Sequence, residues 1–474
     1  MNASASGKRG KGKRFSARWC SAGTVVAVAL LVLSACSSGH SGGAAASSAP
    51  HTTGSSTGAP GATSQPTGAE VTAPGLTTSA SPSEAGNSES ATQTAVPVAP
   101  AAEIVTSSGS QQAINPVTPI TVKVTGGTLA SVRLMDSKEH LVVRGAMAAD
   151  HLSWTSTQVL GYGKGYALEA DAINPDGVAS RSDTDFSTLK PGNMTMPYMD
   201  RIGGDALGDG QTYGVGIVPV VHFDEPITNK KAAEQALHVT TNPSVAGAWY
   251  WADNQNVHWR PKGFWVPGTT VTIAADVYGV DVGNNLYGQS DVTASFTIGR
   301  AQITQAYDNA PHGVDKVNVY DGAGAVLRTM NTSMGKHGGV TVNGKYINFY
   351  TLGGTYTVLE HDNPEMMSSA SYGLPADAPG GYKPEPIYYS TRISNGGIFL
   401  HELDSTVWAQ NHGVDASHGC LNLSKANAVW FFNHSMIGDP VIIHGAAGAP
   451  GIQVWDGGDW SVPWTTWLAG SALH

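Results

Sequence analysis

The chain has 474 residues and a formal net charge of −10 at pH 7, and only 13% of its residues are charged. This length allows two to four domains, each with a core of its own. No long basic stripe occurs beyond Arg18, which argues against nucleic acid as a partner. The 58 glycines and 26 prolines indicate many turns.

The N-terminal segment, residues 1–36, has the pattern of an export signal. Several basic residues precede the apolar run VVAVALLVL, which is shorter than the roughly 18 residues of a membrane-spanning helix. The run leads into Leu-Ser-Ala-Cys36, which resembles a bacterial lipobox and implies that Cys36 is lipid-modified after cleavage. An ordinary cleaved signal peptide is the alternative.

Residues 37–100 are rich in Ser, Thr, Ala, Gly and Pro, with almost no large apolar side chain. Such a segment buries too little surface to fold, so we expect a flexible tether. A lipid anchor followed by a tether predicts a location in the cell envelope, at the outer face of the plasma membrane, with domains that reach the cell wall. Of the three cysteines, Cys20 lies in the signal and Cys36 is expected to carry lipid, which leaves Cys420 without an intramolecular partner.

Two β-sandwiches are expected next, at residues 101–192 and 193–298. Alternating apolar and polar residues predict strands, and the turn sequence Asn-Pro-Asp-Gly separates two of them in the first sandwich. In the second, Pro219 lies within an apolar run and predicts an edge strand or a bulge. Three tryptophans nearby, Trp249, Trp251 and Trp259, are expected in the core rather than in a sugar site. A single helix is expected near residues 230–237.

A third, mostly-β domain is expected at residues 299–446. Strands are predicted at residues 316–321, 325–336, 345–350, 356–362, 396–402 and 439–444, and a helix with Ser424 as N-cap at 424–434. The stretch 366–386 is rich in Gly and Pro and shows little periodicity, as lids and binding loops do. The tail, residues 447–474, carries four tryptophans and is expected to fold back onto another domain.

The segment around Cys420 has the composition of a nucleophilic site. A thiol becomes a strong nucleophile when a base takes its proton, and His401 lies upstream at the end of a predicted strand. His418 is too close along the backbone for easy contact and is expected to position the loop. Gly419 suits an unusual backbone conformation, and the amides of residues 418–420 could bind a developing oxyanion. An inert buried cysteine is the alternative for the thiol alone.

The string from His401 to Leu423 resembles the active-site signature of the L,D-transpeptidases. In that family a strand-ending histidine is followed, after a short connecting segment, by Ser or Thr, His, Gly, Cys and a hydrophobic-Asn pair. Here the connecting segment runs from Glu402 to Ala416 and leads into Ser417. The segments RTMNTSMGK, SYGLPADAPGGYK and RISNGGIFLH extend the resemblance. The lipobox, the two sandwiches and the Trp-rich tail resemble multidomain actinobacterial lipoprotein members, with two immunoglobulin-like domains before a mostly-β catalytic domain.

The resemblance implies roles for individual residues. Cys420 would be the nucleophile and His401 the general base and acid, while His418 and Gly419 would shape the oxyanion hole. The stretch 366–386 would be a lid. Substrate-contacting positions would be Met367, Tyr372, Tyr382, Gly396, Gly397, Trp408, Ser417 and Asn422.

The resemblance also implies a reaction. A peptidoglycan tetrapeptide stem would acylate Cys420 and release D-alanine, and a second stem would complete a 3→3 cross-link. No cofactor or metal is implied, and β-lactams of the carbapenem class would acylate the same thiol. Alternatives are an L,D-carboxypeptidase and an inactive, anchored wall-binding protein. A papain-like protease would place Cys before His, which is the reverse order.

Two departures from the family pattern concern local detail. Glu402 follows the predicted base where many relatives have Ser, which affects the hydrogen bonding expected in the pocket. The loop at Asp281, Asn284 and Asn285 resembles a calcium loop of some relatives, but the neutral Asn284 argues against a cation there.

Overall fold

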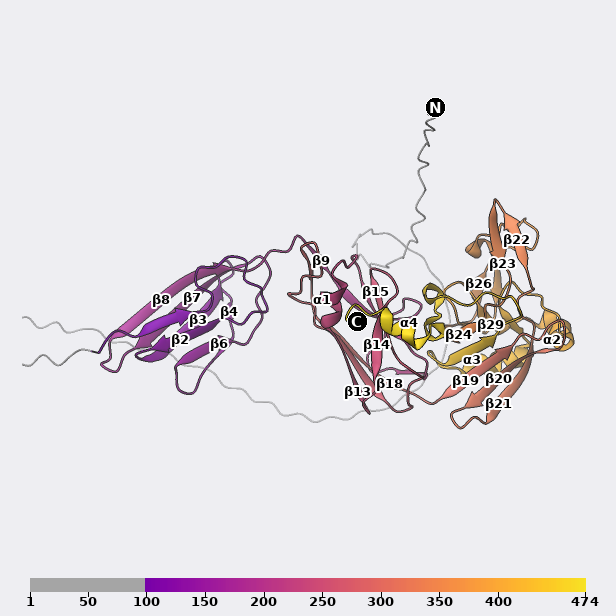
Figure 1. Cartoon of the computed structure of the whole chain (residues 1–474), viewed down its shortest axis with the longest axis horizontal. Helices are drawn as coiled ribbons and strands as arrows, with labels where there is room; N and C mark the ends of the chain where they lie inside the picture. Colours follow the sequence, from indigo (N-terminus) through magenta and orange to yellow (C-terminus); the bar gives the residue numbers. More distant parts are fainter. Residues whose placement is uncertain (1–98) are drawn as a thin grey trace, which may run out of the picture. The chain divides into compact units, whose positions relative to one another are not determined.

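The computed structural model describes residues 99–474, drawn in colour in Figure 1. The signal segment, Cys36 and nearly all of the tether lie outside the described residues. In residues 99–474, no helix is long and apolar enough to cross a membrane. Strands dominate the described part, which confirms the predicted mainly-β fold class.

The first sandwich consists of two four-stranded sheets around a core that includes Val122, Leu134 and Trp154. Residues along β7 alternate, so that Leu168, Ala170 and Ala172 are buried. One sheet has the order β1 (Glu103–Thr106), β2 (Thr121–Thr125), β6 (Ser153–Ser156), β5 (Gly145–Met147). The other has the order β4 (Val142–Val143), β3 (Thr128–Asp136), β7 (Gly165–Ile173), β8 (Ala179–Ser187).

The second sandwich also has two four-stranded sheets, accompanied by a short parallel pair and one helix. The first sheet runs β10 (Pro197–Arg201), β12 (Pro219–Phe223), β15 (Asn256–Pro261), β14 (Gly247–Trp251). The second runs β11 (Thr212–Tyr213), β18 (Val292–Ile298), β16 (Thr270–Ala275), β13 (Leu237–Asn242). The pair is β9 (Asn193–Thr195) with β17 (Leu286–Gly288), and the helix is α1 (Lys230–Gln235).

The prediction that the tryptophans of the second sandwich pack in its core is confirmed. Trp249 and Trp259 face each other across the β14–β15 pair, and Trp251 is buried with them. The prediction for Pro219 is wrong, because β12 lies between β10 and β15 and not at an edge. Pro219 is the first residue of β12 and pairs only with Arg201, while pairing with β15 begins at Val220. Because Pro219 lies before this pairing begins, its missing N–H removes no hydrogen bond between β12 and β15.

The third region contains a five-stranded and a four-stranded sheet. The five-stranded sheet has the order β21 (Val326–Thr332), β20 (Asp315–Asp321), β19 (Gln302–Tyr307), β31 (Pro440–His444), β24 (Gly354–Thr357). The four-stranded sheet has the order β25 (Glu360–Asp362), β28 (Ser390–Arg392), β29 (Phe399–Glu402), β30 (Leu421–Leu423). Two hairpins complete the strands: β22 (Gly339–Val342) with β23 (Lys345–Asn348), and β26 (Glu365–Met367) with β27 (Glu385–Ile387).

Helices of the third region lie around these sheets. The predicted helix at 424–434 is present as α3 (Lys425–His434), with Ser424 at its N-cap position. The structure adds elements that the sequence did not predict: η1 (Ser369–Tyr372), η2 (Asp404–Thr406) and α2 (Val407–His412). The stretch 366–386 is not a simple loop, because its two ends pair as the β26–β27 hairpin.

The C-terminal tail folds back onto the second sandwich, as predicted. It contains η3 (Val454–Asp456), η4 (Asp459–Ser461) and α4 (Trp464–Ala469). The indole N–H of Trp467 donates to the Ala248 carbonyl at 2.9 Å, and its ring stacks on Tyr250 at 4.7 Å between centroids. Trp455 is the exception among the tail tryptophans, since 73% of its surface is exposed.

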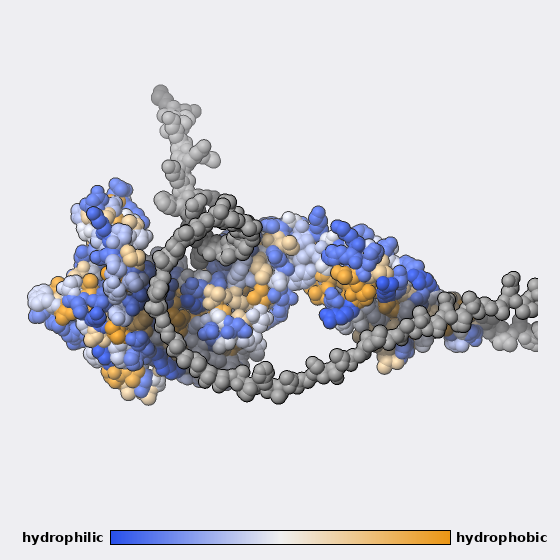
Figure 2. All heavy atoms as spheres, turned by 180° about the vertical axis from the view of Figure 1, so that it is seen from behind, coloured by the Kyte–Doolittle hydropathy of each residue, from blue (hydrophilic) through white to orange (hydrophobic). Residues whose placement is uncertain are grey.

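Hydrophobic residues also occur on the surface, where they are separated by polar ones. Figure 2 shows hydrophobic groups interspersed with hydrophilic side chains on the face opposite to that of Figure 1. Scattered exposed hydrophobic residues are normal for a folded protein and indicate no binding surface by themselves.

Replacing Trp467 with Ala tests how strongly the tail is attached. The ring is fully buried and lies 4.3 Å from the Arg260 guanidinium, so its loss leaves a large cavity beside β14. We expect the free energy of unfolding of this region to fall by about 3–5 kcal/mol, measured by chemical denaturation. Trp455→Ala, at an exposed tryptophan of the same tail, is the control and should change stability little. An equal effect of the two variants would contradict the packing described here.

Candidate active site

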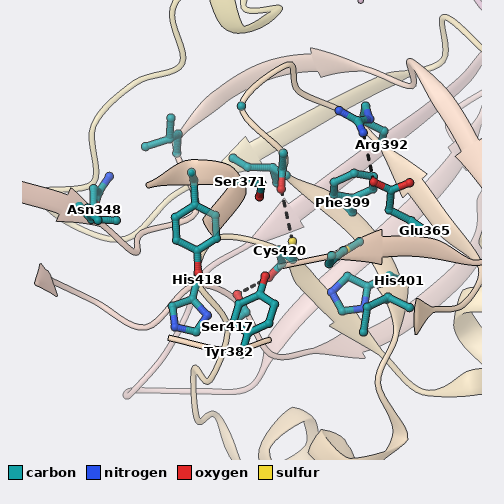
Figure 3. A pocket seen from close by; sticks show the side chains of 18 of the residues that line it. Asn348, Glu365, Ser371, Tyr382, Arg392, Phe399, His401, Ser417, His418 and Cys420 are labelled. Atoms are coloured by element: carbon teal, nitrogen blue, oxygen red, sulfur yellow. Dashed lines mark hydrogen bonds and ion pairs between the residues drawn. The ribbon is translucent and has the colours of Figure 1, made fainter. Parts of the chain in front are cut away.

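Strands β29 and β30 bring the predicted base and nucleophile together. They run parallel, with His401 opposite Asn422 and Leu400 opposite Leu421. Cys420 directly precedes β30, and both side chains line one pocket with a volume of about 640 Å³. Figure 3 shows the His401 ring on one side of the Cys420 sulfur, with the rings of His418 and Tyr382 on the other. The prediction that His401 faces Cys420 from a neighbouring strand is therefore confirmed.

The hydrogen bonding of His401 leaves one nitrogen free for catalysis. Its Nδ1 lies 3.0 Å from the backbone carbonyl of Glu402, which can only accept a hydrogen bond, so Nδ1 carries the proton. Nε2 is then unprotonated and can accept a proton from the pocket. Burial lowers the pKa of His401 to about 4, although the Glu402 carbonyl opposes the shift. The departure from the family pattern at Glu402 leaves this bond intact, because it uses the backbone.

The Cys420 thiol is neutral in the resting site. Burial raises its pKa to about 11, and a hydrogen bond from the Phe399 backbone together with the nearby Arg392 charge offsets only part of that increase. The thiol donates to the Gly397 carbonyl at 3.6 Å. Gly397 holds a φ of 93°, in the region that favours glycine. The structure therefore has a neutral thiol beside a neutral imidazole.

Side-chain and backbone contacts hold the loop before Cys420 in one conformation. Ser417 Oγ donates to the Cys420 carbonyl at 2.6 Å and accepts from the Gly419 amide at 3.0 Å. Thr351 Oγ1 donates to the Gly419 carbonyl at 2.9 Å. Gly419 has a φ of 133°, which confirms that this position needs an unusual backbone conformation.

The same contacts decide which amides can bind an oxyanion. The Gly419 amide is already engaged by Ser417, so it is not free for a substrate. Within residues 99–474, the amides of His418 and Cys420 have no hydrogen-bond acceptor. The Cys420 amide, next to the sulfur, is the better placed donor for a tetrahedral intermediate.

His418 is enclosed by aromatic rings rather than paired with the thiol. Its ring packs edge-on against Phe349 at 4.6 Å and lies 5.6 Å from Tyr382. Burial, helped by the Lys336 charge, lowers its pKa to about 4, so it is neutral. These contacts join the loop of Cys420 to the 366–386 segment and agree with the predicted positioning role.

Most of the predicted substrate-contacting residues line this pocket. They are Met367, Tyr372, Tyr382, Gly396, Gly397, Ser417 and Asn422. Burial raises the pKa of Tyr382 to about 12 and that of Tyr372 further, so both phenols keep their protons as donors. The prediction for Trp408 is wrong: it lies outside the pocket, is 65% exposed and stacks on His412 in α2.

The structure adds pocket residues that the sequence reasoning missed. Asp456 and Trp455 reach the pocket from the C-terminal tail, and Asp456 accepts a hydrogen bond from the Gly396 amide. Arg392 also lines the pocket and pairs with Glu360 at 3.1 Å. In the sequence, Arg392 could have been noticed only as a lone arginine shortly before a predicted strand, in a chain with few charged residues. Nothing in the sequence indicated that the tail would reach residue 396.

Comparisons with known proteins match the two parts of the chain separately. A bacterial Ig domain model matches residues 111–281, and an L,D-transpeptidase catalytic domain model matches residues 303–443. L,D-transpeptidase 2 of Mycobacterium tuberculosis is 41% identical over 357 residues, which cover 75% of this chain and 81% of that protein. L,D-transpeptidase 5 of the same species is 33% identical, over 76% of this chain and 74% of its own.

Solved structures give weaker matches over about half of the chain. An L,D-transpeptidase from Mycobacterium smegmatis has a TM-score of 0.39 at 27% identity, over 52% of this chain and 99% of its own. Another, solved in complex with imipenem, has a TM-score of 0.41 at 26% identity with the same coverage.

The raised pKa of Cys420 predicts how its alkylation by iodoacetamide depends on pH. Only the thiolate reacts, so the rate should rise about tenfold per pH unit from pH 7 to 9, with no plateau near neutrality. Mass spectrometry of the modified peptide measures it. Cys420→Ser corrects for labelling of the other cysteines. A rate already level at pH 7 would mean that the resting thiol is ionised.

Proposed function

Because the chain belongs to the L,D-transpeptidase family, we propose that it forms 3→3 cross-links between peptidoglycan stem peptides. The observation that carries this proposal is the shared pocket of Cys420 and His401, set by the pairing of β29 with β30. An inactive wall-binding protein would not need a thiol and an unprotonated imidazole nitrogen in one cavity.

Acylation begins when the carbonyl of the third stem residue enters the pocket. The Cys420 sulfur attacks this carbon while His401 Nε2 takes the thiol proton, so that no free thiolate has to form beforehand. The negative charge moves to the carbonyl oxygen, where the Cys420 amide donates to it. A donor of this kind is worth about 3–4 kcal/mol in comparable sites. His401 then protonates the leaving amine of D-alanine, and a thioester remains on Cys420.

Transfer repeats these steps in reverse order. The side-chain amine of a second stem attacks the thioester, His401 takes its proton, and the sulfur leaves as the thiol once it recovers that proton. The aromatic cluster of Tyr372, Tyr382 and His418 joins the lid segment to the catalytic loop. We infer that this cluster limits access of water, which favours the amine over hydrolysis.

The N-terminal segment supplies the proposed location. Lipid attached to Cys36 would hold the protein at the outer face of the plasma membrane, and the tether would let the catalytic domain reach the wall. This proposal is supported by the basic residues, the apolar run and the lipobox of the sequence.

Intact mass spectrometry with a purified tetrapeptide stem tests the reaction. We expect an adduct on Cys420 with release of D-alanine, and transfer of the acyl group once acceptor stem is added. Cys420→Ala should form no adduct, and His401→Gln should form it at least about 100-fold more slowly. His412→Gln, at an exposed histidine outside the pocket, is the control.

Three results would count against this proposal. Cross-linked dimers made by Cys420→Ala would refute the role of the thiol. Adducts that discharge only to water would favour the carboxypeptidase alternative. The absence of any adduct in the folded wild type would favour an inactive wall protein.

Carbapenems provide a simpler acyl donor for measuring pH dependence. We propose that they acylate Cys420, with His401 again taking the proton. Since the pKa of His401 is lowered to about 4, its neutral form is complete above about pH 6 and is lost as the pH falls through that pKa. The acylation rate should therefore be level from about pH 6 to 8 and fall below about pH 5. A midpoint near 6.5, as for an unperturbed histidine, would contradict the buried neutral base.

A further inference from the structure

A group of acidic residues and one histidine lies beside the catalytic loop but outside the pocket. Asp308 follows β19, Asp315 begins β20, His337 follows β21, and Asp415 precedes the loop that carries Cys420. One ligand atom each from Asp308, His337 and Asp415 lies within 4.8 Å of the other two. The reaction described above uses none of these side chains.

Two of the carboxylates have one oxygen fixed and the other without a partner. Asp315 Oδ1 accepts from the amides of Asn309 and Ala310 at 2.7 and 2.9 Å. Asp415 Oδ1 accepts from the Met334 amide at 2.7 Å. The second oxygen of each is buried and has no hydrogen-bond partner among the described residues. Asp315 as a whole is completely buried. The carboxyl groups of Asp315 and Asp415 lie close to each other.

His337 does not satisfy this group of oxygens. Its Nε2 lies 3.2 and 3.3 Å from the Asp308 oxygens and 3.2 Å from Asp415 Oδ2. A single N–H can point at only one acceptor, and Asp415 Oδ2 receives no hydrogen bond from it. Asp308 and Asp415 lie beside one imidazole and Asp315 is buried close by, so the ionised form of these carboxyl groups is unfavourable without a compensating cation.

We propose that Asp308, His337 and Asp415 bind a divalent transition metal ion of the Zn²⁺ type, with the fourth position open to water. Ligand bonds of about 2.0–2.1 Å in a tetrahedron place neighbouring ligand atoms about 3.3–3.4 Å apart, close to the separations around His337. An imidazole ligand favours Zn²⁺ over Ca²⁺ or Mg²⁺, which prefer oxygen alone. The Met334 amide orients the Asp415 carboxylate, as outer-shell partners do in metal sites.

The ion would connect two separate segments to the catalytic loop. Met334, whose amide binds Asp415, also accepts hydrogen bonds from the amides of Ala416 and Ser417. Asp415 is therefore a positioning residue, which acts on Cys420 through the backbone. The inference does not depend on the proposed substrate, because a metal site here would stabilise the loop whatever acyl group is transferred.

Calorimetric titration with Zn²⁺ tests the site in the full chain, without affinity-tag histidines and after removal of bound metal by a chelator. Cys420→Ala serves as background, so that the catalytic thiol cannot bind the ion. We expect one Zn²⁺ per chain, and Asp415→Asn or Asp308→Asn should weaken binding by at least about tenfold. His238→Gln, which removes an exposed His–Asp pair at 3.6 Å, is the matched control and should bind normally.

Binding of Co²⁺ can be detected by its visible absorption, without any substitution of the proposed ligand residues. Co²⁺ bound to the same background protein should show the intense visible absorption of four-coordinate cobalt, and added Zn²⁺ should remove it. Absence of both stoichiometric Zn²⁺ binding and this absorption would overturn the proposal, and would mean that the carboxyl groups share protons instead. Tighter binding of Ca²⁺ than of Zn²⁺, or undiminished Zn²⁺ binding by folded Asp415→Asn, would overturn it equally.

Discussion

The parallel register of β29 and β30 is the constraint on which the active site depends. Pairing His401 with Asn422 puts the imidazole on the pocket side of one strand and Cys420 at the start of the next. A shift by one residue would turn His401 away from the pocket, because successive side chains of a strand point to opposite faces. Leu400, Leu421 and Leu423 are almost completely buried, so the core opposes such a shift.

Burial sets the protonation states in this site. It lowers the pKa of His401 and raises that of Cys420, so both groups are neutral before substrate binds. A neutral, partly buried thiol is less prone than an exposed thiolate to reactions such as oxidation. Reactivity then requires a carbonyl group held next to the sulfur, which couples nucleophile activation to substrate binding.

The distant parts of the chain support the pocket through the tail. Asp456 accepts from the Gly396 amide, and a few residues later Trp460 donates to the Gly216 carbonyl of the second sandwich at 2.7 Å. Further along, Arg260 donates to the Val462 carbonyl at 2.7 Å. The sandwich and the pocket wall are thus connected through one short segment.

Much of this arrangement could be predicted from the sequence, for physical reasons. Alternation of apolar residues indicated the strands, and the spacing from His401 to Cys420 indicated a return to a neighbouring strand. Contacts between remote segments could not be predicted, as with Asp456 beside Gly396, or Asp308 and Asp415 beside His337. Trp408 was placed wrongly because α2 was not predicted, and this helix carries the ring out to solvent.

The most direct test of the neutral pair is the tautomer of His401, measured by ¹⁵N NMR on histidine-labelled protein, with His401→Gln to assign the signal. The account predicts a proton on Nδ1 and none on Nε2 throughout pH 6 to 8. An imidazolium with both nitrogens protonated at pH 7 would contradict it, since the resting site would then be a thiolate–imidazolium ion pair.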